Sequence, residues 1–337
     1  MRWSRLFFIS LYATIFLFYA HEFRKSRLLK TTSARVFPSA SAGRLLCDPH
    51  LSAIVDCVSL APRIFFVPIC NSSFTVPNLL NDFSAHQVEW SLMGKTKAFW
   101  SVLVDLPQDD NQVTPIMMER FYSRGELDIK DLVSQTREKY ADWNLEGDVL
   151  DFGCGLGRLA AAVAQLDGVR SVACVDQSVH HLEKAKKFTA SLPMKARFNT
   201  VVSGPDLLMA LQQGEQFPKC FDFVNSLIAF QHMITPLQAV YLEQLCDVLK
   251  PGGVMRVQIP SETALEPACN EKLRESYRVT GGMQMHYIDE GSLRSILAKR
   301  GCEAIVEDIG SAWVGGDQKS SMVYARKRID HHQPCSM

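Results

Sequence analysis

The feature that most constrains this chain is the segment Val149–Arg158, in which a short apolar run ends in an acid followed by three alternating glycines. The order is D-x-G-x-G-x-G, starting at Asp151. The apolar run predicts a buried strand and the alanine-rich stretch after Arg158 predicts a helix, so the glycines form the turn between them. Glycine adopts positive φ and lets a ligand approach the backbone closely. The segment therefore predicts a ligand-binding loop in an α/β fold.

The spacing of the glycines distinguishes between two ligands. A dinucleotide-binding loop has the order G-x-G-x-x-G, in which the third glycine lets helix and strand pack closely. Here that third position is Arg158, which is large and charged. The acid before the first glycine, Asp151, would repel a pyrophosphate but suits a cationic ligand. S-adenosylmethionine carries an ammonium and a sulfonium, so the loop favours it over NAD.

Charge and cysteine content exclude several other classes. Lys+Arg and Asp+Glu both number 36, so the formal net charge is zero and no nucleic-acid partner is expected. The ten cysteines include no C-x-x-C pair, which argues against a zinc ribbon, and no metal site is predicted. Cys154, Cys174 and Cys246 lie in apolar runs and are predicted to be small buried hydrophobic residues. This scatter favours a reducing compartment.

The first 23 residues carry a hydrophobic segment, Leu6–Ala20, preceded by two arginines. Fifteen helical residues span only about 22 Å, short of the roughly 30 Å hydrocarbon core, and extending the helix over residues 3–23 approaches spanning length. No small-residue cleavage site follows. An uncleaved signal anchor, a cleaved signal peptide, an organelle-import signal and a buried core helix remain open, the last being least favoured. The chain is therefore expected to be membrane-anchored by this segment or directed to an organelle by a cleaved presequence.

Five regions are predicted along the chain. Residues 1–23 form the signal or anchor segment, and residues 24–85 a basic, proline-containing linker or targeting region of low order. Residues 86–145 form a helical lead-in, which either caps the ligand site or covers one edge of the sheet. Residues 146–328 form the main domain, and residues 329–337 a disordered tail.

Apolar β-branched runs alternate with helical patterns after the glycine loop. With the run at Val149 they give seven predicted strands, and the intervening helices predict an α/β fold with a doubly wound sheet. The later strands are predicted at residues 171–175, 196–202, 221–227, 254–259, 303–309 and 320–326, and helices at 128–143, 178–190, 206–213, 236–249 and 288–300.

Polar residues at strand ends are the candidates for ligand contact. Asp176 ends the second strand, where an acid accepts hydrogen bonds from both hydroxyls of an adenosyl ribose, a signal that NAD enzymes share. The alternative is a surface acid that caps the next helix. Asn225 and Ser226 end the fourth strand, next to the glycine loop in a doubly wound sheet. His232 follows and is a candidate general base, although a histidine in such a loop is more often structural.

The segment Tyr241–Gly253 reads Y-L-E-Q-L-C-D-V-L-K-P-G-G, an amphipathic helix followed by a Pro-Gly-Gly stop before a strand. Together with the glycine loop, Asp176 and the run F-D-F-V-N-S, it resembles the class I S-adenosylmethionine-dependent methyltransferases over about residues 140–326. The resemblance implies a Rossmann-like sheet of order 3-2-1-4-5-7-6 with helices on both faces and a final antiparallel hairpin. It implies S-adenosylmethionine as cofactor and methyl transfer as the reaction.

The resemblance also implies a set of site residues. Asp206 stands where an acid often meets the adenine amino group in this family, with an ordinary helix cap as the equal alternative. The expected cofactor-binding residues are Asp151, Gly153, Cys154, Gly155, Gly157, Asp176, Gln177, Asp206, Asn225 and Ser226.

Three functions remain open at this stage. A methyltransferase acting on a small-molecule acceptor is favoured, because the D/N-P-P-Y signature of enzymes that methylate nucleic-acid or glutamine amino groups is absent. A non-catalytic S-adenosylmethionine-binding scaffold of the same fold is the second. An NAD-linked oxidoreductase is the third, and Arg158 disfavours it. The acceptor atom and the oligomeric state are not specified by the sequence.

Overall fold

The structure is a computed structural model that describes residues 76–213, 217–262, 286–312 and 319–330. The predicted signal or anchor segment, residues 1–23, lies outside these ranges, as do most of the predicted linker and most of the predicted tail. Among the helices of the described ranges, none combines the length and the hydropathy that crossing a membrane requires.

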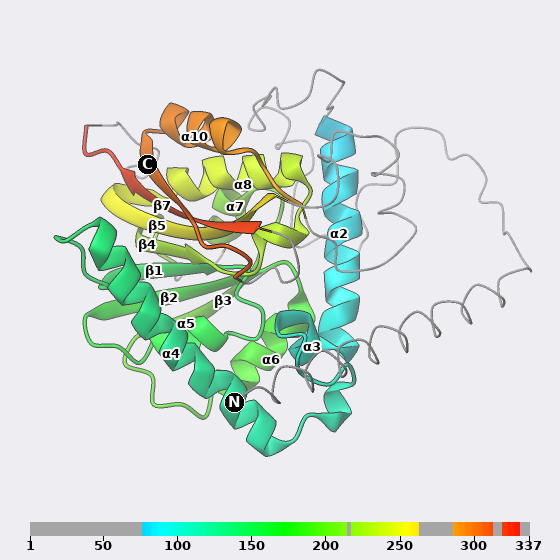
Figure 1. The fold of residues 1–337 in the computed structure, drawn as a ribbon. Coiled ribbons are helices and arrows are strands. Elements are labelled where there is room, and N and C mark those ends of the chain that lie inside the picture. The colour runs from blue at the N-terminus through cyan, green and yellow to red at the C-terminus, as the bar shows by residue number, and fades with distance from the viewer. Residues whose placement is uncertain (1–75, 214–216, 263–285, 313–318, 331–337) are drawn as a thin grey trace, which may run out of the picture. The chain divides into compact units, whose positions relative to one another are not determined.

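A seven-stranded sheet forms the centre of the domain (Figure 1). Its strands are β1 (Gly147–Phe152), β2 (Val169–Asp176), β3 (Arg197–Val202), β4 (Phe221–Ser226), β5 (Leu249–Glu262), β6 (Cys302–Asp308) and β7 (Lys319–Lys327). Their order is β3-β2-β1-β4-β5-β7-β6, which confirms the predicted order. Strands β1 to β5 pair in parallel, and β7 is antiparallel to both β5 and β6. The carboxyl ends of the parallel strands therefore meet along one edge of the sheet.

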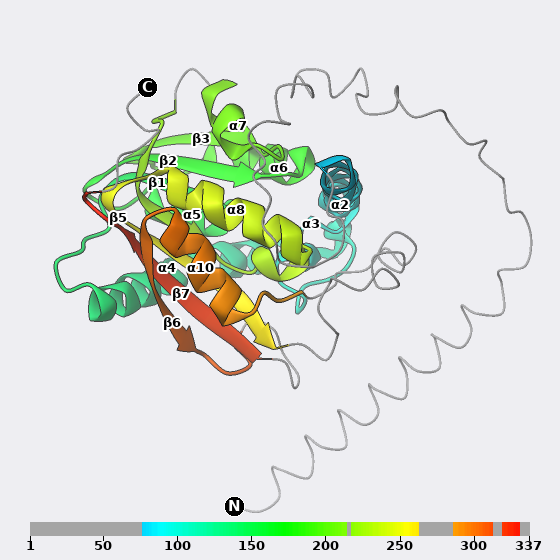
Figure 2. The ribbon, with the colours of Figure 1, turned by 90° about the horizontal axis from the view of Figure 1, so that it is seen from above.

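Helices cover both faces of the sheet, as predicted (Figures 1 and 2). One face carries α4 (Pro115–Lys139), α5 (Arg158–Val163) and α6 (Val179–Thr189), and the other carries α7 (Leu207–Gln213), α8 (Thr235–Asp247) and α10 (Glu290–Lys299). Ile129 and Leu182 are buried on the first face, and Leu242 and Leu297 on the second. Burying one such side chain contributes about 1.5–3 kcal/mol.

The lead-in consists of α2 (Val76–Thr96), α3 (Ala98–Val102), the short 3-10 helix η2 (Asp110–Gln112) and α4. Helix α2 begins before the predicted boundary at residue 86. Helix α4 begins earlier than the helix predicted over residues 128–143, because the Thr114 side chain accepts a hydrogen bond from the Met117 backbone N–H and Pro115 suits the first helical turn.

The predicted start of the fifth strand at Val254 is wrong. Strand β5 begins at Leu249, which pairs with Phe221, and its register with β4 shifts before Val254 pairs with Phe223. The Pro-Gly-Gly segment therefore lies in an irregular part of the strand rather than before it. Gly252 has φ +79°, a conformation that glycine adopts without strain.

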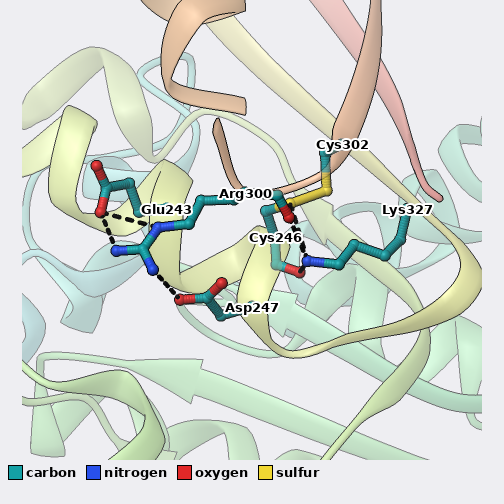
Figure 3. The surroundings of a disulfide bond; sticks show 6 residues. All are labelled: Glu243, Cys246, Asp247, Arg300, Cys302 and Lys327. Carbon is teal, nitrogen blue, oxygen red and sulfur yellow. Dashed lines mark hydrogen bonds and ion pairs between the residues drawn. A yellow bond between two sulfur atoms is a disulfide. The ribbon is translucent and has the colours of Figure 1, made fainter. Parts of the chain in front are cut away.

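The prediction that three cysteines are small buried hydrophobic residues is only partly correct. Cys154, Cys174 and Cys246 are buried, as predicted, but Cys154 is bonded to Cys174 and Cys246 to Cys302. The first disulfide ties the glycine loop to β2. The second ties α8 to β6, beside the buried Lys327 (Figure 3). Disulfides of this kind are typical of oxidising rather than reducing compartments.

Candidate active site

The glycine loop follows β1 and is held against the end of β2. Gly153, Gly155 and Gly157 all have positive φ, at 71°, 53° and 74°. The Gly153 N–H donates to the Val175 carbonyl at 2.8 Å, and the Gly155 N–H donates to Asp176 Oδ2 at 2.9 Å. The glycine loop is therefore hydrogen-bonded to Asp176, the acid that was predicted to bind the ribose.

Close neighbours explain why two of these positions need glycine. A Cβ added at Gly153 would lie 2.2 Å from Ala229 Cβ, in the loop after β4. One added at Gly155 would lie 3.0 Å from Val102 Cγ2, in the lead-in. The glycine loop is thus in close contact with Ala229, in the segment after β4, and with Val102 of the lead-in.

A pocket opens at this edge of the sheet. Four of the predicted cofactor-binding residues line it, namely Gly153, Gly155, Asp176 and Gln177. Residues from the loop after β4 and from the lead-in complete the wall. The described residues that line it are His86, Trp90, Ser101, Val102, Phe152, Gly153, Gly155, Asp176, Gln177, His181, Ser203, Leu227, Ile228, Ala229, Met233 and Tyr241. Among these described residues Asp176 is the one acid, and there is neither lysine nor arginine.

Both carboxylate oxygens of Asp176 are held in place. Oδ2 accepts from the Gly155 N–H at 2.9 Å, and Oδ1 accepts from the Ser178 N–H at 2.8 Å. Ser178 caps α6, the helix predicted over residues 178–190, through its own side chain. A carboxylate oxygen accepts more than one hydrogen bond, so Asp176 can still bind two hydroxyl groups.

Asp151 lies behind the loop and does not line the pocket. Its Oδ1 accepts from Asn225 Nδ2 at 2.8 Å, while Asp151 Oδ2 and Asn225 Oδ1 are buried acceptors that find no donor among the described residues. Burial raises the pKa of Asp151 to about 6, against the Asn225 hydrogen bond, the positive charge of Arg158 and the Ala160 backbone N–H. The remaining acceptor capacity of Asp151 and Asn225 fits a cationic ligand group, directly or through water.

The other predicted cofactor residues have structural partners and do not line the pocket. Cys154 is in the disulfide, and Gly157 is the N-cap of α5. Asp206 accepts from the Met209 N–H at 2.9 Å, which is the cap that the sequence left as the alternative. Ser226 Oγ donates to the Phe152 carbonyl at 2.8 Å.

His232, the predicted general base, is 8% exposed and does not line the pocket. Its ring stacks at an angle against Trp90, with centroids 5.1 Å apart. Its Nε2 lies 3.1 Å from Gln231 Nε2, an amide that only donates, so Nε2 is the accepting nitrogen of this pair. A ring nitrogen occupied in this way is not positioned to take a proton from a ligand in the pocket.

The residues that the lead-in contributes to the pocket were not predicted from the sequence. His86 and Trp90 of α2 and Ser101 of α3 line the pocket, together with His181 of α6. Ser101 Oγ lies 2.8 Å from His181 Nε2 and also donates to the Ala98 carbonyl, so His181 is the donor to Ser101. The one sequence signal for these contacts was the aromatic, amphipathic character of the lead-in.

Ile228 was also missed. It lines the pocket and has φ +63°, which is a strained conformation for a β-branched residue. Its backbone N–H donates to Gln258 Oε1 at 3.1 Å, and Gln258 in turn donates to Ser320 Oγ at 2.7 Å. Such strain costs about 1–3 kcal/mol and concentrates at functional sites.

The described residues contain no group of three or more His, Cys, Asp or Glu side chains arranged to hold a metal ion.

Comparison with known proteins identifies one domain family. The model of a methyltransferase domain matches residues 149–253. No curated protein sequence is significantly similar to the chain.

Several solved structures are similar to the chain at low identity. A magnesium protoporphyrin IX methyltransferase from Synechocystis PCC 6803 with bound SAH is 17% identical, with TM-score 0.47, over 72% of this chain and 99% of that one. Phosphoethanolamine N-methyltransferase 2 from Haemonchus contortus with S-adenosyl-L-methionine is 17% identical, with TM-score 0.42, over 59% and 52%. The cyclase SpnF is 17% identical, with TM-score 0.41, over 59% and 80%.

The identification therefore rests on the family-model match and on the strand order of this structure. Residues 149–253 match the model of a methyltransferase domain, and the superfamily-level resemblance to the class I S-adenosylmethionine-dependent methyltransferases predicted from the sequence is confirmed.

Proposed function

We propose that this protein transfers a methyl group from S-adenosylmethionine to a small-molecule acceptor bound in the pocket at the carboxyl ends of β1, β2 and β4. The observation that carries the proposal is the convergence of Gly153, Gly155 and Asp176 on one pocket. Glycines there let a ligand lie against the backbone, and an acid at the end of β2 accepts hydrogen bonds from a ribose.

The residues present fit this cofactor. Asp176 would hold the ribose hydroxyls. The buried acceptors Asp151 Oδ2 and Asn225 Oδ1 lie behind the loop, where they would stabilise the ammonium. When bound, the cofactor supplies a methyl group on a positively charged sulfur, which is already activated for transfer.

The protein's own contribution is then alignment and exclusion of water. Val102 closes over Gly155 from the lead-in, and Ala229 lies against Gly153 from the loop after β4. Trp90 and Ile228 add apolar surface to the wall. Because the described lining contains neither lysine nor arginine, we expect an acceptor that is neutral or cationic rather than a carboxylate or a phosphate.

The NAD-linked alternative has less support. Arg158, at the position of the third dinucleotide glycine, is 4% exposed and forms an ion pair with Asp128 of α4. Its guanidinium also lies 5.7 Å from the Phe121 ring centroid. A dinucleotide-binding loop requires a small residue at this position so that the helix and the strand pack closely. Arg158 is large, and its side chain is buried in the ion pair with α4.

The experiment that tests the proposal is calorimetric binding of S-adenosylhomocysteine to Asp176→Ala. We expect a loss of at least about tenfold in affinity, because two charge-assisted hydrogen bonds are removed. Asp167→Asn is the matched control, since the Asp167 side chain is 91% exposed and does not line the pocket, and the affinity of this variant should equal that of the wild type.

Equal affinity of Asp176→Ala and the wild type would overturn the assignment. Stabilisation of the wild type by NADH but not by S-adenosylhomocysteine in a thermal-shift measurement would favour the oxidoreductase. Cofactor binding without turnover on any member of an acceptor library would favour the non-catalytic scaffold.

We also propose that the domain resides in an oxidising compartment, to which the predicted N-terminal hydrophobic segment directs the chain. The two buried disulfides support this, because such bonds persist where thiols are not kept reduced. The test is maleimide labelling of the chain from its native cells under denaturing conditions. Cys246 and Cys302 should be labelled only after reduction, and labelling without reductant would exclude this placement.

A further inference from the structure

Ile228 holds an unusual backbone conformation on the pocket wall. Among the described residues it is the one non-glycine residue with positive φ, at +63°. It lies between β4 and the short 3-10 helix η3 (Phe230–His232), and it lines the pocket together with Leu227 and Ala229. A β-branched residue disfavours this conformation, so the surrounding structure must hold it in place.

Hydrogen bonds fix the chain on both sides of Ile228. Before it, Ser226 Oγ donates to the Phe152 carbonyl at 2.8 Å, which ties the end of β4 to β1. After it, the Gln238 amide donates to the Phe230 carbonyl at 2.8 Å, which ties η3 to α8. The chain must therefore turn in the short segment between these two anchors, and Ile228 is the residue that takes the left-handed conformation.

Gln258 of β5 holds the peptide group of Ile228 itself. Its Oε1 accepts from the Ile228 N–H at 3.1 Å, and its Nε2 donates to Ser320 Oγ at 2.7 Å. The Ser320 hydroxyl in turn donates to the Ile259 carbonyl at 3.4 Å. An N–H only donates and a carbonyl only accepts, so this chain of hydrogen bonds has one consistent direction. Gln258 and Ser320 are both fully buried, and neither lines the pocket.

The conformation of Ile228 determines where the next residue lies. A Cβ added at Gly153 would lie 2.2 Å from Ala229 Cβ, so Ala229 is in contact with the glycine loop. Gly153, Ile228 and Ala229 all line the pocket. A change of φ at Ile228 to the common negative region would move Ala229 relative to Gly153. The gap between the glycine loop and the segment after β4 would then change, and with it the shape of the pocket.

We propose that Gln258 is a positioning residue for the cofactor site, because it stabilises the strained conformation of Ile228 and thereby the contact of Ala229 with the glycine loop. Gln258 acts without touching the ligand. The inference rests on the proposed function, since the affinity that Gln258 controls is that for an adenosyl ligand in this pocket. It also gives a role to a fully buried amide, which costs stability unless its hydrogen bonds are made.

The test is Gln258→Met, in which the side chain keeps its length but loses both hydrogen-bonding groups. Calorimetry should show S-adenosylhomocysteine binding about threefold to tenfold more weakly, the factor by which one neutral hydrogen bond shifts such an equilibrium. Gln258→Glu is the conservative control. Burial keeps the new carboxyl protonated, so one oxygen accepts and the other donates as in the amide, and the affinity should stay within about twofold of the wild type.

Variants at position 228 distinguish positioning from general damage to the sheet. Glycine adopts positive φ without strain and alanine does not, although both substitutions remove the isoleucine side chain. Gln258→Met should therefore weaken binding in Ile228→Ala by about the same factor as in the wild type, but by less than about twofold in Ile228→Gly. Equal weakening in the two backgrounds, or no weakening in the wild type, would overturn the inference.

A second variant covers the case in which Gln258→Met does not fold. Ser320→Ala removes the acceptor of the Gln258 amide and leaves Oε1 in place. It should weaken binding about twofold to threefold, and again not in Ile228→Gly. Unchanged affinity in Ser320→Ala would then count against the role of Gln258.

Melting temperatures separate this inference from the proposed function. Ile228→Gly should melt about 2–4 °C above Ile228→Ala whether or not a nucleoside binds, because only alanine is strained there. Equal melting temperatures would show that Ile228 is not held under strain and would refute the inference. A wild type that does not bind S-adenosylhomocysteine at all would instead contradict the proposed function.

Discussion

Asp151 combines a charge with nearly complete burial. It is 4% exposed, and burial raises its pKa to about 6 although Asn225 and Arg158 favour the ionised form. Asp176, nearby, adds a like charge that acts in the same direction as burial. Near neutral pH the side chain is thus poised between its neutral and ionised forms. A cationic ligand beside it would favour the ionised form and would bind more tightly when that form is already present.

We therefore expect the affinity for S-adenosylhomocysteine to rise as the pH rises through about 6, by up to about tenfold between pH 5 and pH 7.5. The sign follows from the charge: Asp151 is largely neutral below pH 6 and attracts the ligand's ammonium only above it. Calorimetry at a series of pH values measures this.

Methylthioadenosine provides the control for that pH series, because it has the adenosyl group but no ammonium. Any effect of His86 or His181 titration on binding of the adenosyl group should appear with this ligand too. The affinity of methylthioadenosine should not rise with pH as that of S-adenosylhomocysteine does. Asp151→Asn should lose the rise for S-adenosylhomocysteine. A rise that persists in the variant would show that another group is responsible.

The site residues that could be predicted from the sequence are those whose position depends on the neighbouring residues in the chain. Gly153, Gly155 and Asp176 line the pocket because each stands at a fixed place relative to the end of a strand. His86 and Trp90 could not be found in this way. His86 contacts Gln177 across 91 positions of the chain, and only the packing of α2 on the edge of the sheet brings them together.

At the scale of elements, the contact between α4 and α5 is unusually close. A Cβ added at Gly125 of α4 would lie 2.5 Å from the Arg158 carbonyl oxygen and 2.9 Å from its Cγ. The ion pair between Arg158 and Asp128 lies one turn further along α4. The close approach lets the Arg158 side chain reach Asp128 while both helices cover the sheet.

We expect Gly125→Ala to destabilise the protein by about 1–2 kcal/mol, because overpacking outweighs the gain in helix propensity. Urea unfolding measures the change. Gly291→Ala is the matched control: Gly291 lies in an exposed turn of α10, where the added methyl meets only the Asp289 side chain at 3.3 Å. That variant should be neutral or more stable by up to about 1 kcal/mol. Equal stability of the two variants would contradict the packing argument.

Element types were predictable from the sequence and element boundaries were not. The Ser178 cap of α6 and the alternation of strands and helices follow from residue patterns. The irregular start of β5 was missed, because the register of Leu249 depends on the partner strand β4 rather than on its own residues.

At the scale of the whole domain, two disulfides whose cysteines both lie in the described ranges join segments that are distant in sequence or belong to different layers. Cys246 of α8 is bonded to Cys302 of β6 across 56 positions, and Cys154 to Cys174 across 20. Around the Cys246–Cys302 bond, Arg300 forms ion pairs with Glu243 and Asp247, and the Lys327 ammonium donates to the Cys246 and Arg300 carbonyls (Figure 3). Burial lowers the pKa of Lys327 to about 8.

We expect the pair of substitutions Cys246→Ser and Cys302→Ser to cost about 4 kcal/mol, and loss of the Cys154–Cys174 bond to cost about 3 kcal/mol, since the larger loop constrains the unfolded chain more. Urea unfolding under oxidising conditions measures both. A reductant should then destabilise the wild type more than the Cys246→Ser, Cys302→Ser variant. Equal sensitivity to reductant would show that the Cys246–Cys302 bond does not stabilise the domain.

The position of β7 in the sheet has a consequence for synthesis. Strand β7 lies between β5 and β6, although β6 comes before it in the chain. Until the ribosome has made β7, β6 lacks the strand with which it pairs in this sheet. During the same time the edge of β5 that β7 will cover is open. Open strand edges recruit other nascent chains. Products that terminate before Lys319 should therefore aggregate or be held by chaperones rather than accumulate as a smaller folded enzyme.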